Sequence, residues 1–131
     1  MADRASTQLV HKEWPETVAR PAKAGRRGNF DMVILDPTAL RQATIAEFQD
    51  GLVKPVVVIE IGLNCGAQHL RDDVNKLTNS AIDHSYVVHL SRNPVHHHPD
   101  LVEQLHRPSV QIATALAGTL SPTYRLLQRP P

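Results

Sequence analysis

The chain is poor in cysteine and in aromatic residues, and it lacks a long apolar run. Cys65 is the single cysteine, so no disulfide can form within the chain. Aromatic residues make up 4% of the sequence and hydrophobic residues 41%, which predicts one modest core of Val, Ile and Leu. The longest apolar stretch, residues 55–62, is interrupted by Glu60 and is far shorter than the ~20 residues that cross a bilayer. These absences argue against a membrane protein and against a disulfide scaffold.

Neither sign of charge predominates, because 14 Lys and Arg stand against 13 Asp and Glu in 131 residues. A net charge near +1 argues against holding nucleic acid by bulk electrostatics, so any such contact must come from a local basic patch. The N-terminal segment MADRASTQLVHKEW carries charges where a signal peptide has an apolar block. Together with the lone cysteine, this predicts a cytoplasmic protein of one domain.

The hydrophobic pattern predicts an α/β fold, with a central mixed sheet flanked by helices. Residues 55–62 form a near-continuous β-branched run, typical of a strand buried on both faces of a sheet. A Pro-rich tail, residues 121–131, follows a single domain of residues 1–120. We expect strands at 7–14, 29–35, 55–62 and 84–91, helices at 38–50, 67–80 and 99–106, a loop at 16–28, and either a strand or a helix start at 109–116.

Two acids, Asp31 and Glu60, lie inside otherwise apolar strands. An unpaired buried carboxylate costs several kcal/mol, so a cation, a hydrogen-bond network or water must compensate each of them. If the two strands are neighbours, these acids can form an oxygen-rich site for Mg²⁺ or Mn²⁺, with Glu13 as a third acid. The alternative is that each acid pairs with a nearby Arg or Lys, and spacing alone does not decide between the two.

The succession VHKEWP, GRRGNFDMVIL, PVVVIEIG, DVNKL and SYVVHLS resembles the PD-(D/E)xK nuclease superfamily, which has the restriction endonuclease-like fold. The resemblance covers residues 8–92 and implies that Asp31 and Glu60 bind the metal. It also matches Asp73, Lys76 and Leu77 to the helix signature of that family. The implied activity is metal-dependent hydrolysis of nucleic-acid phosphodiester bonds.

One position departs from the family motif. The family places a Lys two residues after the Glu, and this chain has Gly62 there, which offers neither a donor nor a charge. Lys76 on the next helix is the better replacement, because strand alternation puts Lys12 on the opposite face from Glu13. Two rival interpretations remain open: a non-catalytic restriction endonuclease-like domain that binds nucleic acid or serves in assembly, and a structural protein. The helix that precedes the first strand in the family is also not evident.

Several polar groups have both a functional and a structural interpretation. The basic loop carries Lys23, Arg26 and Arg27, with Arg20 nearby, and it either clamps the phosphate backbone of DNA or is an ordinary solvated run. Residues 96–98 are three consecutive histidines, read as a loop unless other residues such as Asp100 complete a metal site.

Two further expectations concern pairing. On the helix 67–80, Asp73 and Lys76 have the spacing of a structural ion pair, with His69 on the same face. A chain of this size with exposed sheet edges is also expected to form a homodimer.

Overall fold

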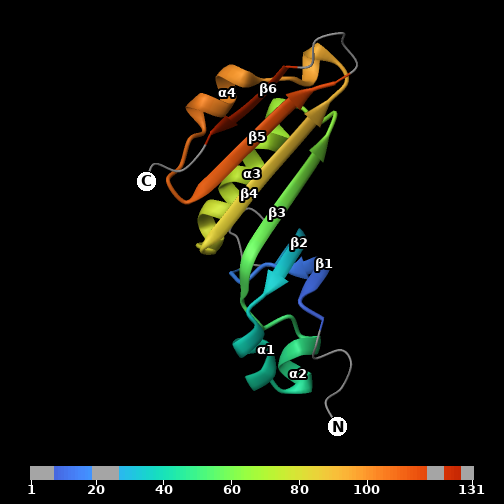
Figure 1. The fold of residues 1–131 in the computed structure, drawn as a ribbon, viewed down its shortest axis with the longest axis vertical. Helices are drawn as coiled ribbons and strands as arrows, with labels where there is room; N and C mark the ends of the chain where they lie inside the picture. The colour runs from blue at the N-terminus through green and yellow to red at the C-terminus, as the bar shows by residue number, and fades with distance from the viewer. Residues whose placement is uncertain (1–7, 19–26, 118–122, 128–131) are drawn as a thin grey trace.

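The computed structural model describes residues 8–18, 27–117 and 123–127. In these residues the strands form one six-stranded sheet in the order β1-β2-β3-β4-β5-β6, with helices between them (Figure 1). The predicted α/β fold with a mixed sheet is therefore confirmed. In chain order the elements are β1 (Val10–Pro15), β2 (Asn29–Leu35), α1 (Pro37–Gln42), α2 (Ile45–Gln49), β3 (Pro55–Leu63), α3 (Ala67–Ser80), β4 (His84–Ser91), the short 3-10 helix Pro94–His96, α4 (Pro99–Gln104), β5 (Val110–Leu116) and β6 (Thr123–Leu127).

The sheet is antiparallel at both ends and parallel in the middle. Strands β1, β2 and β3 form an antiparallel meander, β3, β4 and β5 run parallel, and β6 returns antiparallel to β5. A parallel pair needs a crossover, and α3 and α4 supply the two crossovers here. The long strand β3 joins the two parts, because its first half pairs with β2 and its second half continues along β4 (Figure 1).

Helix α3 covers one face of the parallel strands and passes behind them in Figure 1. Its residues Leu70, Val74 and Leu77 are buried, as the helical stripe predicts. On β3 the inward residues are buried, whereas Ile61 and Leu63 on the other face are 40% and 64% exposed. The expectation that residues 55–62 are buried on both faces was therefore wrong, since α3 packs on one face of this strand and Ile61 on the other face stays exposed.

Residues 38–50, expected as one helix, form two short helices. Asp36 caps α1 by accepting hydrogen bonds from the backbone N–H groups of Thr38 and Ala39. The chain then leaves the helix at Ala43, and Thr44 begins α2 in a capping box with Glu47. The hydrophobic periodicity alone predicts one continuous helix, but the second capping signal, at Thr44, starts a new one.

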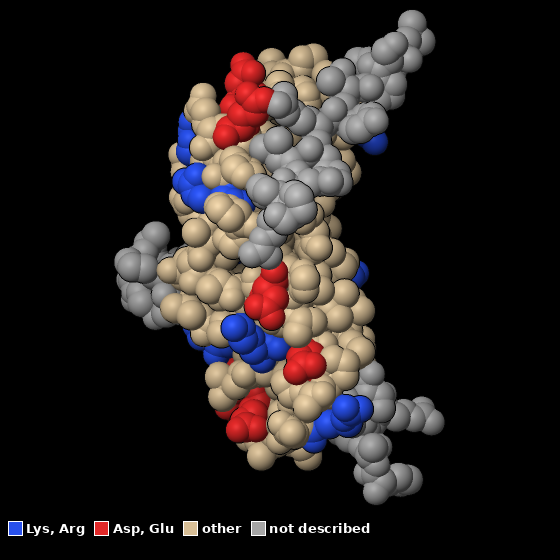
Figure 2. Space-filling model, turned by 60° about the vertical axis from the view of Figure 1, so that its left-hand side comes forward, with Lys and Arg blue, Asp and Glu red and all other residues tan. Residues whose placement is uncertain are grey.

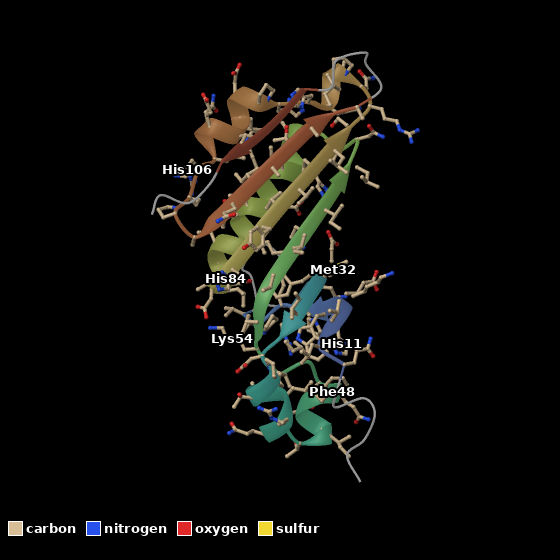
Figure 3. The ribbon with its side chains drawn as sticks, in the orientation of Figure 1. His11, Met32, Phe48, Lys54, His84 and His106 are labelled. Atoms are coloured by element: carbon tan, nitrogen blue, oxygen red, sulfur yellow. The ribbon has the colours of Figure 1, made fainter. Side chains whose placement is uncertain are left out.

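The N-terminal strands and the short helices share an aromatic cluster. The rings of His11, Trp14 and Phe48 lie with centroids 5.0 to 5.5 Å apart, between β1 and α2 (Figure 3). The indole N–H of Trp14 donates to the carbonyl of Val53, just before β3 begins. These contacts anchor the meander that carries Asp31.

The C-terminal part differs from expectation in extent. Residues 109–116, for which strand and helix both remained open, form β5. Beyond residue 121, where a loose tail was expected, β6 pairs with β5 from Thr123 to Leu127. The sheet thus continues past the predicted domain limit of residue 120. No helix among the described residues is both long enough and apolar enough to cross a membrane.

Candidate functional site

Asp31 and Glu60 meet at the point where β3 separates from β2. The β2–β3 ladder ends at Met32, which pairs with Ile59 and is labelled in Figure 3. At the next pair of residues, hydrogen bonds from backbone to side chain take the place of the backbone hydrogen bonds between the strands. The Asp31 N–H donates to Glu60 Oε1 at 3.2 Å, and the Ile61 N–H donates to Asp31 Oδ2 at 2.8 Å. The structure therefore places the two acids that the sequence singled out side by side, each accepting from the backbone of the other strand. The expectation that both are buried was wrong for Asp31, which is exposed, whereas Glu60 is buried.

Lys76 of α3 is hydrogen-bonded to one of these two acids. Its Nζ donates to Glu60 Oε2 at 3.0 Å and to the carbonyl of Asn29 at 3.0 Å. Asp73, expected to pair with Lys76, is instead held by two histidines. A lysine from the following helix thus contacts the Glu60 carboxylate directly. Its role as a replacement for the lysine that the resemblance expects two residues after Glu60 stays a prediction.

Burial governs the protonation of Glu60, whose side chain is 1% exposed. Removal from water raises the pKa of this carboxyl from 4.5 to about 7, while Lys76 lowers it through charge and a hydrogen bond, and Asp31 and Asp73 raise it through charge repulsion. One lysine is therefore insufficient to offset the burial of this carboxylate.

A second cluster, His69, Asp73 and His89, lies beside the acid pair. Asp73 Oδ2 is 3.0 Å from His89 Nε2 and 3.3 Å from His69 Nε2. One ligand atom from each residue lies within 4.8 Å of the other two, so this group could hold a metal ion. His69 and Asp73 are one helical turn apart and were noted in the sequence, but His89 comes from β4 and was not connected to them.

Gly62 makes room for His89. The two residues are register partners on β3 and β4, and a Cβ added at Gly62 would lie 2.6 Å from His89 Nε2 and 2.7 Å from its Cε1. The imidazole thus occupies the space that a side chain at position 62 would need. A side chain at position 62 would therefore have to displace the imidazole.

Gly62→Ala is therefore expected to destabilise the protein by roughly 1–3 kcal/mol, the usual cost of overpacking a filled site. The new methyl group must displace the His89 ring, which is buried and in contact with Asp73. Urea denaturation of Gly62→Ala, His89→Ala and the double variant measures this. In the His89→Ala background the cost of Gly62→Ala should largely disappear, and an unchanged cost there would contradict the steric explanation.

Glu13, the third acid of the sequence prediction, lies at the level of Asp31. Lys12 pairs with Met32 and Trp14 with Phe30, which places Glu13 opposite Asp31 on β1. Its backbone has φ +52°, a left-handed conformation that is uncommon for a residue other than glycine. Its side chain is exposed. Register brings Glu13 to the site, and its participation stays a prediction.

The basic loop is only partly described. Arg20, Lys23 and Arg26 lie outside the described residues. Arg27 donates from Nε to the carbonyl of Glu16 at 2.7 Å and from its two terminal nitrogens to the carbonyls of Asp50 and Gly51, so its guanidinium joins this loop to the end of α2. On the face shown in Figure 2, basic and acidic side chains are interspersed. The phosphate-clamp role stays a prediction.

The run of residues 96–98 is not part of the three-residue metal cluster found among the described residues. His97 Nδ1 lies 3.2 Å from Thr114 Oγ1, and the carbonyl of His96 accepts the hydroxyl of Ser91. Both contacts join the segment after β4 to the sheet. His96 ends the short 3-10 helix, so the loop expected at residues 96–98 is confirmed for His97 and His98 alone. The Cys65 thiol donates to the carbonyl of Leu63 within its own turn.

No family model, no curated protein and no solved structure matches the chain. What the structure defines is an α/β protein with a buried carboxylate–lysine pair at a strand divergence. Next to that pair, a second cluster is formed by His69 and Asp73 of α3 and His89 of β4.

Proposed function

We propose that the protein is a restriction endonuclease-like, divalent-metal-dependent nuclease that hydrolyses phosphodiester bonds of DNA. The observation that carries the proposal is the meeting of Asp31, Glu60 and Lys76 where β2 and β3 separate. The acids come from adjacent strands and the lysine comes from the next helix, in the chain order that the resemblance implies. Fold alone does not define an activity, so the proposal rests on these three side chains.

The donor set fits Mg²⁺ or Mn²⁺. Both ions prefer hard oxygen ligands, and Asp31 and Glu60 offer two carboxylates at one place in the sheet. The residual cost of burying Glu60, expressed in its pKa of about 7, is relieved by a bound cation. When bound, such an ion supplies Lewis-acid polarisation of the phosphoryl oxygen and an acidified water.

Lys76 fixes the position of the Glu60 carboxylate and places a positive charge beside it. Its side chain is 13% exposed, and the second contact, to the carbonyl of Asn29, holds the ammonium against β2. A preorganised cation in a partly buried site stabilises negative charge that develops on a phosphate. In this account Lys76 supplies the charge that Gly62 lacks.

A non-catalytic nucleic-acid-binding module is the second candidate. The observation that favours it is the His89 ring over Gly62, which fills the motif lysine's position with a group committed to Asp73. The two candidates differ in cleavage and agree in DNA binding.

The homodimer expected from the sequence stays a prediction that light scattering tests.

Cleavage of supercoiled plasmid and of single-stranded DNA tests the proposal. We expect nicking with Mn²⁺ or Mg²⁺ and none with EDTA. Because the ion must displace the proton from Glu60, the rate should rise with pH up to about 7 and change less above it. Retention of DNA without cleavage under any of these conditions would favour the non-catalytic module.

A further inference from the structure

The cluster of His69, Asp73 and His89 has the chemistry of a transition-metal site, distinct from the acid pair. Two imidazole nitrogens and one carboxylate oxygen are ligands that suit Zn²⁺ and related ions, whereas the carboxylates of Asp31 and Glu60 suit Mg²⁺. We propose that His69, Asp73 and His89 bind one Zn²⁺-class ion through three protein ligands, with a fourth position open.

Two of the three distances between donor atoms are close to those of tetrahedral coordination. Zinc lies about 2.0–2.1 Å from nitrogen and oxygen ligands, so tetrahedral neighbours around it are roughly 3.3 Å apart. The Asp73 Oδ2 atom is 3.3 Å from His69 Nε2 and 3.0 Å from His89 Nε2. The remaining pair of donor atoms is within 4.8 Å, and the two rings have centroids 5.5 Å apart. One donor atom of each residue thus lies within 4.8 Å of the other two, and two of the three separations are close to the tetrahedral value.

Burial of the cluster is graded from one side to the other. The side chains of Asp73 and His89 are 6% and 7% exposed, while that of His69 is 49% exposed. The two buried residues thus come from α3 and β4, and His69 is the one in contact with solvent. An ion at this cluster would therefore be held from the inside by Asp73 and His89 and reached from solvent on the side of His69.

Gly62 is the second feature built around this cluster. If residue 62 had a side chain, its Cβ would collide with the His89 ring, whose Nε2 contacts Asp73. Gly62, which stands where the resemblance expects a lysine, therefore leaves the space that the His89 nitrogen ligand occupies. The inference does not depend on nuclease activity.

Calorimetric titration of the metal-free full chain with Zn²⁺ tests the inference, with the melting temperature as a second readout. We expect one tight site and a higher melting temperature with Zn²⁺. His69→Ala should weaken binding by more than about 100-fold, since even outer-sphere partners of metal ligands contribute roughly 10- to 100-fold. His69 is half exposed, so this variant should fold, and circular dichroism checks that it does.

Three controls separate this site from others. His84→Ala removes an exposed histidine from the same strand and should leave Zn²⁺ binding unchanged. Asp31→Asn should also leave it unchanged, because Asp31 belongs to the acid pair. A variant with alanine at residues 96–98 should retain the site. Absence of Zn²⁺ binding, unchanged binding in His69→Ala, or loss of binding in Asp31→Asn or in the 96–98 variant would overturn the inference.

Discussion

Metal-dependent DNA cleavage should fall by at least about 100-fold in Asp31→Asn and in Glu60→Gln, the range lost when one preorganised electrostatic partner of a reaction is removed. Each substitution keeps the shape of the side chain and removes its charge. Asn and Gln are weaker ligands for a hard cation, and each substitution removes one of the two negative charges that attract it. Initial rates of plasmid nicking at saturating Mn²⁺ measure the effect.

Asp83→Asn is the matched control for this experiment. Asp83 is exposed in the turn between α3 and β4, so the same change of charge there should leave the rate within about twofold of the original, as is usual for surface substitutions. Folded variants of Asp31 and Glu60 that cleave as fast as the parent would contradict a role for the acid pair in catalysis.

Lys76→Met is expected to lower the free energy of unfolding by about 3 kcal/mol at pH 8.5 and by about 1 kcal/mol at pH 5. At pH 5 the carboxyl of Glu60 is protonated in the folded protein, because its pKa is about 7, so the substitution removes only hydrogen bonds. At pH 8.5 the carboxylate is ionised and buried, and the substitution removes the lysine that pairs with it among the described residues. Urea denaturation at the two pH values gives the difference.

The sign follows from proton linkage. The pKa of Glu60 is higher in the folded chain than its ordinary value of 4.5, so the folded state holds this proton more tightly. The stability that this provides is present below pH 4.5 and is lost as pH rises through about 7. Without Lys76 the pKa rises further and the loss extends to higher pH. Equal destabilisation at both pH values would contradict the ion pair, and Lys54→Met, at an exposed site, should show almost none.

The most regular elements of the fold were predictable from local pattern. Residues 29–35 and 84–91 form strands and residues 67–80 form a helix, with the expected limits. Each has a strong period or a dense β-branched run between clear boundary residues. Residues 38–50 show the limit of this reasoning, because the capping box of Thr44 and Glu47 starts a new helix within one periodic stretch.

Features that depend on how the elements are placed in three dimensions were harder to predict from the sequence. Burial of both faces of residues 55–62 was predicted from composition, but whether a helix covers a face is decided by the crossovers. Asp31 and Glu60 stood out because acids are costly in apolar strands, and their contact follows from strand pairing. The link between Gly62, Asp73 and His89 requires the register of β3 with β4, which no local signal in the sequence gives.

The most direct test of the account is to locate Mn²⁺ by anomalous scattering in crystals of the protein. The account predicts an ion within about 2.5 Å of one carboxylate oxygen of Asp31 and one of Glu60, with Lys76 still beside Glu60. Crystals grown at saturating Mn²⁺ that show no ion at these two carboxylates, or an ion only at His69, Asp73 and His89, would contradict it.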